Sequence, residues 1–261
     1  MNMRLEVVIK GKDKVLEDSI KDLGRRFFIE RVKGYLLFSF PIKDETEIDK
    51  ILKYIEDKLP EDSEIINTSL SFRKELDLHG YRITIGAEKK RTEEKEIILK
   101  KGLAFGGFHP TTKMCLQLLL EAVRRGFIIR TALDLGTGNG ILAIMAKKLG
   151  INKVFAVDID YEACVECKEN AGINDVEIGI VCGDQDCIKG RFQLVLVNII
   201  FHVTERIMDR IKEMVEKKGL LIISGFISSR KDVIKDKLKE DGIFIEEKED
   251  EGWGAILWQK E

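Results

Sequence analysis

The feature that constrains the fold most is a hydrophobic strand that runs into a glycine-rich turn and then into an apolar helix. Residues 131–135 predict a buried strand, and residues 141–149 predict the helix. The run Gly-Thr-Gly-Asn-Gly at 136–140 joins them. Glycines there let a ligand approach the backbone closely, and the helix beyond them offers free N–H groups. This unit therefore predicts a ligand site at one edge of a parallel sheet.

The spacing of the glycines favours one type of ligand. Gly136, Gly138 and Gly140 alternate with other residues, unlike the Gly-x-Gly-x-x-Gly spacing of dinucleotide-binding turns. Asp134 stands two residues before the first glycine. A carboxylate there suits a ligand that carries an ammonium and a sulfonium, and it repels a pyrophosphate. The alternative is a tight strand–helix turn that binds nothing.

Two further predicted strands end near acidic residues. Asp158 closes the strand 153–158, where a doubly wound sheet places the ribose of a bound nucleoside. Asp160 can instead cap the following helix. Asp184 follows the strand 176–181 and can accept a hydrogen bond from an adenine amino group, although a solvated loop carboxylate is the alternative.

Polar residues also occur at a fourth strand end and before the first helix of this half. Asn198 ends the apolar strand 192–199, and it either lines the ligand site or caps the next helix. Thr111 or Thr112 can cap the helix that begins near them. Three glycines and two phenylalanines in 102–108 suggest a flexible apolar lid, and we interpret His109 as structural rather than as a base.

The regular alternation of strands and helices after residue 101 predicts an α/β domain with a mainly parallel sheet covered on both faces. The predicted strands are 131–135, 153–158, 176–181, 192–199, 220–224, 243–247 and 255–259. The predicted helices are 141–149, 161–171, 203–216 and 229–240.

The first part of the chain has a different pattern. Strands are predicted at 4–9, 26–32, 35–40 and 64–72, and helices at 13–23 and 45–59. The order βαββαβ is typical of a ferredoxin-like α+β domain, with helices on one face of an antiparallel sheet. The pattern weakens around the charged run 88–96. We therefore predict a domain over 1–72, a linker over 73–101 with one or two short strands, and a second domain over 102–261.

Composition narrows the partners. A net charge of −2, from 44 basic and 46 acidic residues, lacks the excess of base that holds a phosphate backbone, so direct nucleic-acid binding is not expected. No apolar stretch reaches the ~18 residues that span a bilayer, and the start of the chain lacks a signal-peptide pattern. We expect a cytoplasmic protein that does not bind a membrane.

The cysteines are few and odd in number, unlike a secreted disulfide framework. A four-thiolate zinc site is one interpretation of the last four, but small buried side chains are the favoured one, and no metal is expected. The five are Cys115, Cys164, Cys167, Cys182 and Cys187.

Together these segments resemble the PrmA family, methyltransferases that modify a large-subunit ribosomal protein (protein L-eleven). The resemblance rests on Gly-Leu-Ala-Phe-Gly at 102–106, His-Pro-Thr-Thr at 109–112, Asp-Leu-Gly-Thr-Gly-Asn-Gly-Ile-Leu-Ala-Ile at 134–144, Val-Asp-Ile-Asp at 157–160 and Asn-Ile-Ile at 198–200. It implies a Rossmann-like class I methyltransferase domain with a mainly parallel seven-stranded sheet. The family's domain order, with a small α/β domain before the methyltransferase domain, also matches. Because the first domain has its own strand–helix pattern, we expect it to recognise a macromolecular substrate; an appendage that stabilises the second domain or makes a dimer is the alternative.

The resemblance implies S-adenosylmethionine as cofactor and contacts to it from Thr112, Gly136, Asp158 and Asn198. The strand–turn pattern adds Asp134, Gly138 and Asp184 to the predicted cofactor site. Asn198 is also the predicted catalytic residue, because its side-chain oxygen can accept a hydrogen of an amine. The expected partner is a protein, and the resemblance implies one of the large ribosomal subunit.

Three alternatives to this function stay open. The acceptor could be a different protein or a small molecule. The same sheet could serve a nucleotide-dependent oxidoreductase, against which the glycine spacing and Asp134 argue. The domain could also be a non-catalytic module that a bound cofactor merely stabilises.

Overall fold

The structure is a computed structural model that describes residues 3–10, 28–32, 35–42, 47–60, 63–72, 74–86, 93–100 and 108–261. The chain divides into two compact units, Met1–Arg73 and Lys74–Glu261. Each unit has its own hydrophobic core, and each is described by itself below.

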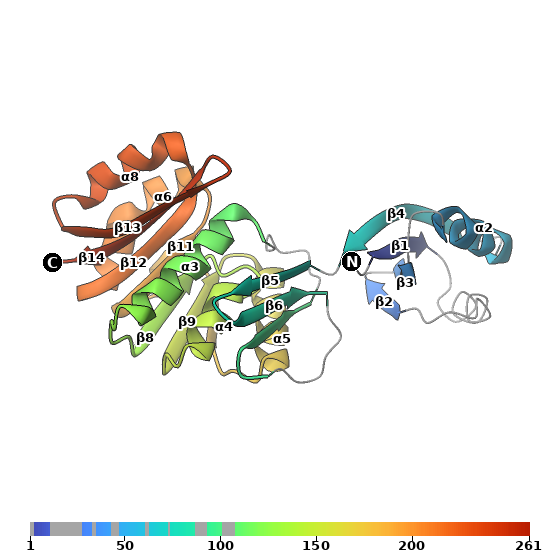
Figure 1. Cartoon of the computed structure of the whole chain (residues 1–261), viewed down its shortest axis with the longest axis horizontal. Coiled ribbons are helices and arrows are strands. Elements are labelled where there is room, and N and C mark those ends of the chain that lie inside the picture. Colours follow the sequence, from blue (N-terminus) through green and yellow to red (C-terminus); the bar gives the residue numbers. More distant parts are fainter. Residues whose placement is uncertain are drawn as a thin grey trace. The chain divides into compact units, whose positions relative to one another are not determined.

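The first unit is an antiparallel sheet with the strand order β2-β3-β1-β4 (Figure 1). Its elements are β1 (Met3–Lys10), β2 (Phe28–Val32), β3 (Tyr35–Ile42), α2 (Ile48–Lys58) and β4 (Glu64–Phe72). Alternate residues of β1 and β3 form the core, and Ile51 and Ile55 of α2 pack on them. This order agrees with the ferredoxin-like prediction. The predicted helix 13–23 lies outside the described residues, so the assignment stays a prediction.

The second unit is built on a seven-stranded sheet of order β10-β9-β8-β11-β12-β14-β13. The strands are β8 (Thr131–Leu135), β9 (Lys153–Asp158), β10 (Gly179–Cys182), β11 (Phe192–Asn198), β12 (Val215–Ile227), β13 (Gly242–Asp250) and β14 (Trp253–Lys260). All pairs are parallel except the two that involve β14. The predicted mainly parallel, seven-stranded sheet is confirmed.

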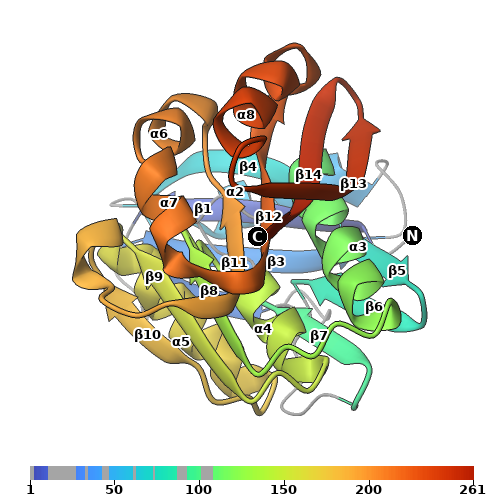
Figure 2. The ribbon, with the colours of Figure 1, turned by 90° about the vertical axis from the view of Figure 1, so that its left-hand side faces the viewer.

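The period of two along each central strand sends apolar side chains to both faces of this sheet. On one face, Leu194 and Leu196 of β11 share a buried cluster with α3 (Pro110–Arg124) and α4 (Ile141–Lys148). On the other face, Val195 and Val197 share a cluster with α7 (Met208–Met214) and α8 (Lys231–Leu238). Figure 2 shows α3 and α7 on opposite sides of the strands. Each helix thus covers one face, as predicted for an α/β domain.

The predicted linker 73–101 holds regular structure in its described residues. β5 (Lys74–Leu78), β6 (Tyr81–Ile85) and β7 (Glu96–Leu99) form a three-stranded sheet. Ile83, Ile97 and Leu99 are fully buried in the same cluster as α3 and α4, and β7 contacts α4 and α5 (Tyr161–Ile173). This sheet is therefore a second layer of the carboxy-terminal unit rather than a connection between two units.

The predicted helix 203–216 is wrong in one respect. It is two helices, α6 (Phe201–Arg206) and α7, separated at Ile207. The break turns Met208, Ile211 and Met214 onto the sheet, and Val215 already pairs with Phe192 as the first residue of β12. Strand pairing and burial thus override helical periodicity at this point. In the described part of the chain, no helix is both long and apolar enough to cross a membrane.

Candidate functional site

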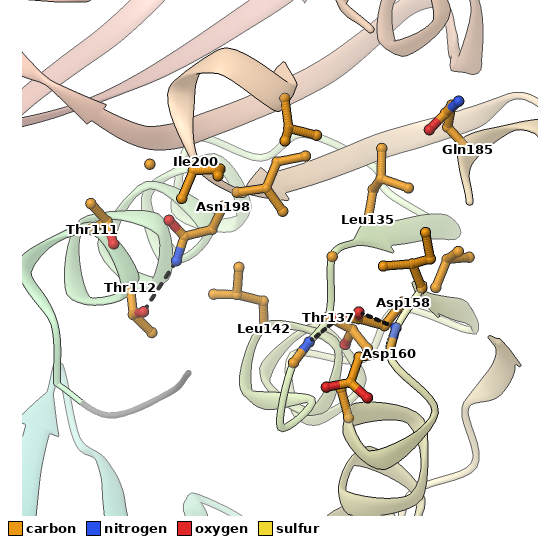
Figure 3. A pocket seen from close by; sticks show the side chains of 18 of the residues that line it. Thr111, Thr112, Leu135, Thr137, Leu142, Asp158, Asp160, Gln185, Asn198 and Ile200 are labelled. Carbon is orange, nitrogen blue, oxygen red and sulfur yellow. Dashed lines mark hydrogen bonds between the residues drawn. The ribbon is translucent and has the colours of Figure 1, made fainter. Parts of the chain in front are cut away.

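A pocket of about 660 Å³ lies at the carboxyl ends of the parallel strands (Figure 3). Its size falls within the range of roughly 300–1,000 Å³ that is usual for small-molecule sites. The turn after β8, the ends of β9 and β11, the loop after β10 and the start of α3 all line it. The structure therefore gathers in one place the strand ends that the sequence singled out.

The glycine turn forms the floor of the pocket. Gly136, Gly138 and Gly140 have φ of +74°, +53° and +85°, a region that residues with a side chain rarely adopt. The N–H groups of Gly136 and Thr137 both donate to the carbonyl of Val157, at 2.8 and 3.0 Å. The turn is thus held against the end of β9, and at Gly136 it packs on the side chain of Ile199, which leaves no room for a Cβ.

Asp158 is the half-buried last residue of β9 and lines the pocket. One carboxylate oxygen accepts from the N–H of Gly138 at 2.9 Å, and the other accepts from the N–H of Asp160 at 3.0 Å. Each oxygen keeps acceptor capacity for the hydroxyl groups of a ligand. Asp160 caps α5 by accepting from the N–H of Glu162 at 2.9 Å, as predicted.

Asp134 lies behind the turn and is 1% exposed. One carboxyl oxygen accepts from the Thr137 hydroxyl at 2.7 Å and from the N–H of Ala143 at 3.1 Å, whereas Oδ1 has no partner. Burial raises the pKa of Asp134 to about 7, against the opposing effect of these two hydrogen bonds. The structure thus places Asp134 beneath the pocket residues and not among them.

Asn198 and Thr112 come together on the opposite side of the pocket, although 86 residues separate them. The Asn198 amide nitrogen donates to the Thr112 hydroxyl at 3.1 Å, which leaves the amide oxygen on the other side of the group (Figure 3). Asn198 does not cap the next helix, since Ile200 occupies that cap position without a side-chain bond. The amide is therefore oriented by Thr112 and available to a ligand.

The predicted cap of α3 by Thr111 or Thr112 is wrong. His109 occupies the cap position, and its Nδ1 accepts from the N–H of Thr111 at 3.4 Å. The imidazole ring also meets Trp253 edge-on, with ring centroids 4.9 Å apart. Pro110 is the first residue of the helix, where its fixed φ suits the first turn. The imidazole of His109 can then accept the helix N–H that a serine or threonine hydroxyl usually accepts at a cap position. His109 thus has a structural role, in line with its interpretation from sequence.

Trp253 and Gly225 are among the pocket residues that the sequence did not predict. Trp253 begins β14 and reaches the pocket only through the antiparallel pairing of β14 with β12, which no local pattern encodes. Gly225 has φ of +89° at a register shift in β12, next to the backbone of Ile199. A glycine inside a strand is a known sign of a bulge or a close approach, so this one could have been found.

The loop after β10 carries the remaining predicted residue. Asp184 is exposed, lines the pocket, and accepts from the N–H of Asp186 at 2.9 Å. Three carboxylates, those of Asp158, Asp160 and Asp184, line the pocket against the guanidinium of Arg206. This balance suits a cationic nucleoside and opposes a pyrophosphate. Residues 102–107 of the predicted lid, 102–108, lie outside the described residues.

This fold, with its glycine turn and the acid at the end of the neighbouring strand, defines a Rossmann-like methyltransferase of class I. The family model described as "Ribosomal protein L11 methyltransferase (PrmA)" matches residues 79–261. The chain belongs to this family, which confirms the resemblance drawn from the sequence.

Similar proteins cover most of the chain. A ribosomal protein L11 methyltransferase of Thermotoga maritima is 31% identical in an alignment of 257 residues that covers 92% of this chain and 94% of that protein. One of Dictyoglomus turgidum is 31% identical over 96% of this chain and 89% of its own length. The crystal structure of a ribosomal protein L11 methylase from Lactobacillus delbrueckii aligns with a TM-score of 0.62 at 27% identity, over 72% of this chain and 98% of that one.

The buried carboxyl of Asp134 leads to a prediction about stability. Its folded pKa lies above the value of 3.8 for a free carboxyl, so the folded protein holds a proton that the unfolded chain gives up. The contribution of this carboxyl to the free energy of unfolding is fully present below pH 4. It is lost as the pH rises toward 7, and the loss is on the order of 3–4 kcal/mol. Asp134→Asn should therefore unfold with a flatter dependence on pH between 4 and 7. Urea denaturation across this range checks it, with the exposed Asp232→Asn as the control; parallel curves for Asp134→Asn and wild type would refute it.

Proposed function

We propose that this protein uses S-adenosylmethionine to methylate amino groups of ribosomal protein L11 in the cytoplasm. The observation that carries the proposal is the arrangement of the pocket. Asp158 and the glycine turn form one side, and an oriented amide, Asn198, forms the other. The names of the relatives support the choice of acceptor, since each is an L11 methyltransferase or methylase.

The residues on the carboxylate side fit a cationic nucleoside. Asp158 would accept from the ribose hydroxyls, because each of its oxygens holds only one N–H. Asp184 would accept from the adenine amino group. Gly136 and Gly138 would lie against the methionine portion, and Asp134 would act through the turn, which its Thr137 and Ala143 contacts brace.

The residues on the amide side fit an amine acceptor. Bound S-adenosylmethionine supplies an activated methyl on a sulfonium, so the chain's task is to align the acceptor with it. Proximity and orientation can lower a barrier by roughly 7–11 kcal/mol. The Asn198 oxygen would accept a hydrogen of the neutral amine. This hydrogen bond would point the lone pair of the amine nitrogen toward the methyl. The Thr112 hydroxyl accepts from the amide nitrogen of Asn198, and this hydrogen bond fixes the direction of the amide oxygen.

The amino-terminal unit would recognise the protein substrate. It has its own core of Leu5, Phe38, Ile55 and their neighbours, and the described residues that line the pocket all lie between 109 and 253. A first unit whose described residues do not line the pocket supports a role in docking a macromolecule. The less favoured alternative is an appendage that only stabilises the rest.

The proposal is tested by methyl transfer. Purified protein, labelled S-adenosylmethionine and recombinant L11 should give labelled L11, and mass spectrometry should place the methyl groups on amines. Calorimetry should show binding of S-adenosylmethionine and none of nicotinamide dinucleotides. Cofactor binding with transfer only to small molecules would sink the protein-acceptor proposal, and tight binding of a nicotinamide dinucleotide would favour the oxidoreductase.

Asp158→Ala tests the ribose contact. The substitution removes charge-assisted hydrogen bonds, so affinity for S-adenosylmethionine should fall by about 1–3 kcal/mol. Calorimetric titration measures this. Asp160→Ala is the matched control, because that carboxylate caps α5 and should affect stability more than affinity. Unchanged affinity in a folded Asp158→Ala protein would contradict the assignment.

Thr112→Val separates orientation of the amide from cofactor binding. Valine keeps the shape of threonine and removes the hydroxyl that accepts from Asn198, so the amide can turn. We expect kcat to fall, with a larger loss for Asn198→Ala, while affinity for the cofactor changes less than turnover in both variants. Steady-state kinetics with calorimetry decide. Equal losses of affinity and turnover would mean that both residues only hold the cofactor.

A truncated protein that begins at Lys74 tests the role of the first unit. It keeps β5–β7, which the second unit buries, so it should fold and bind S-adenosylmethionine like the full chain. Transfer to L11 should be much slower, because docking is lost. Circular dichroism and calorimetry establish folding and binding before rates are compared. A truncated protein as fast as the full chain would show that the first unit does not recognise the substrate.

A further inference from the structure

Asn170 of α5 and Asn174, which caps the carboxyl end of that helix one turn later, are fully buried. Asn174 binds β7 and its own helix: it accepts from the Ile98 N–H at 2.9 Å and donates to the Ile98 carbonyl at 2.6 Å and the Asn170 carbonyl at 2.7 Å. Asn170 instead joins two segments. Its oxygen accepts from the N–H of Lys100 at 2.9 Å, and its nitrogen donates to the carbonyl of Asn139 at 2.9 Å.

The Asn139 carbonyl belongs to the glycine turn. The same peptide unit carries the N–H of Gly140, which donates to the Thr137 carbonyl at 2.9 Å. A peptide that precedes a glycine can reverse, because glycine accepts φ of either sign. With its carbonyl held by Asn170 and its N–H held within the turn, this peptide cannot reverse without breaking two hydrogen bonds. Gly140 also packs directly on α5, where a Cβ would come within 2.7 Å of the Cys167 sulfur.

We propose that Asn170 is a positioning residue that locks the glycine turn in its ligand-binding shape from behind the pocket. The inference rests on the proposed function, since it names the device that keeps the turn ready for S-adenosylmethionine. Thr137 and Asn139 line the pocket, whereas Asn170 does not. Asn170 therefore acts through the Asn139–Gly140 peptide and not by touching a ligand.

Asn174 is the control residue against which the effect of Asn170 on ligand binding can be compared. Both asparagines are buried and both bind the chain of β7 or its next residue, so both contribute to stability. Alanine at Asn174 removes three of the hydrogen bonds above and leaves the turn untouched, whereas alanine at Asn170 removes two and frees the Asn139 carbonyl. A purely structural role would make affinity follow the number of bonds lost.

The experiment compares full-length Asn170→Ala and Asn174→Ala with wild type by calorimetric titration of S-adenosylmethionine and by thermal melting. We expect both to melt at lower temperature. Asn170→Ala should bind the cofactor about tenfold more weakly, the effect of one lost buried hydrogen bond, and Asn174→Ala should bind like wild type. With L11 as acceptor, Asn170→Ala should show a raised KM for the cofactor and a nearly unchanged kcat.

Wild-type affinity in Asn170→Ala, or equal weakening in both variants, overturns the inference. Failure of wild type to bind S-adenosylmethionine overturns the proposed function first and this inference with it. If Asn170→Ala does not fold, Asn170→Asp keeps the acceptor for the Lys100 N–H and lacks the donor to Asn139. Amide hydrogen exchange of Gly140 in the wild-type protein gives an independent reading: slow exchange supports a locked peptide, and fast exchange refutes it.

Discussion

The contact on which the pocket depends is the one between the glycine turn and the last two residues of β9. The Val157 carbonyl accepts two N–H groups of the turn, and the Asp158 carboxylate accepts a third. Asp158 therefore has two tasks: it completes the turn, and it presents its remaining lone pairs to the pocket. Because the same hydrogen bonds fix the turn and the carboxylate, neither can shift without the other. Glycine at 136 and 138 makes this possible, since both have positive φ.

The two sides of the pocket are built over different distances along the chain. Apart from Asp184, the carboxylate side comes from 134–160, a single strand–helix–strand passage, and its hydrogen bonds join residues within that passage. The amide side joins Thr112, Asn198 and Trp253, which only the completed sheet brings together. If tertiary packing is lost, the residues of the amide side should therefore separate first. Hydrogen bonds within the 134–160 passage could still hold parts of the carboxylate side together.

The same difference explains what could be predicted from sequence. Glycine spacing, strand ends and capping are local, and they predicted the turn, Asp158, and Asp160 as a cap. A four-residue strand such as β7 is too short to show a period, and its burial depends on contacts with distant segments. The sequence therefore predicts only a linker with one or two short strands there. The cap by His109 and the roles of Trp253 and Asn170 depend on contacts across the fold. No window of sequence encodes such contacts.

Asp134 is where stability and ligand binding have opposite requirements. A carboxyl that is 1% exposed, with one oxygen unpaired, costs free energy that an apolar or amide side chain would not. Its hydrogen bonds to Thr137 and Ala143 offset part of that cost and stiffen the start of α4. A cation bound above the turn would favour the ionised form and offset more of it. The buried carboxyl thus destabilises the free protein at the place where a positively charged ligand would stabilise it most. Such a local cost in stability is expected at a binding site.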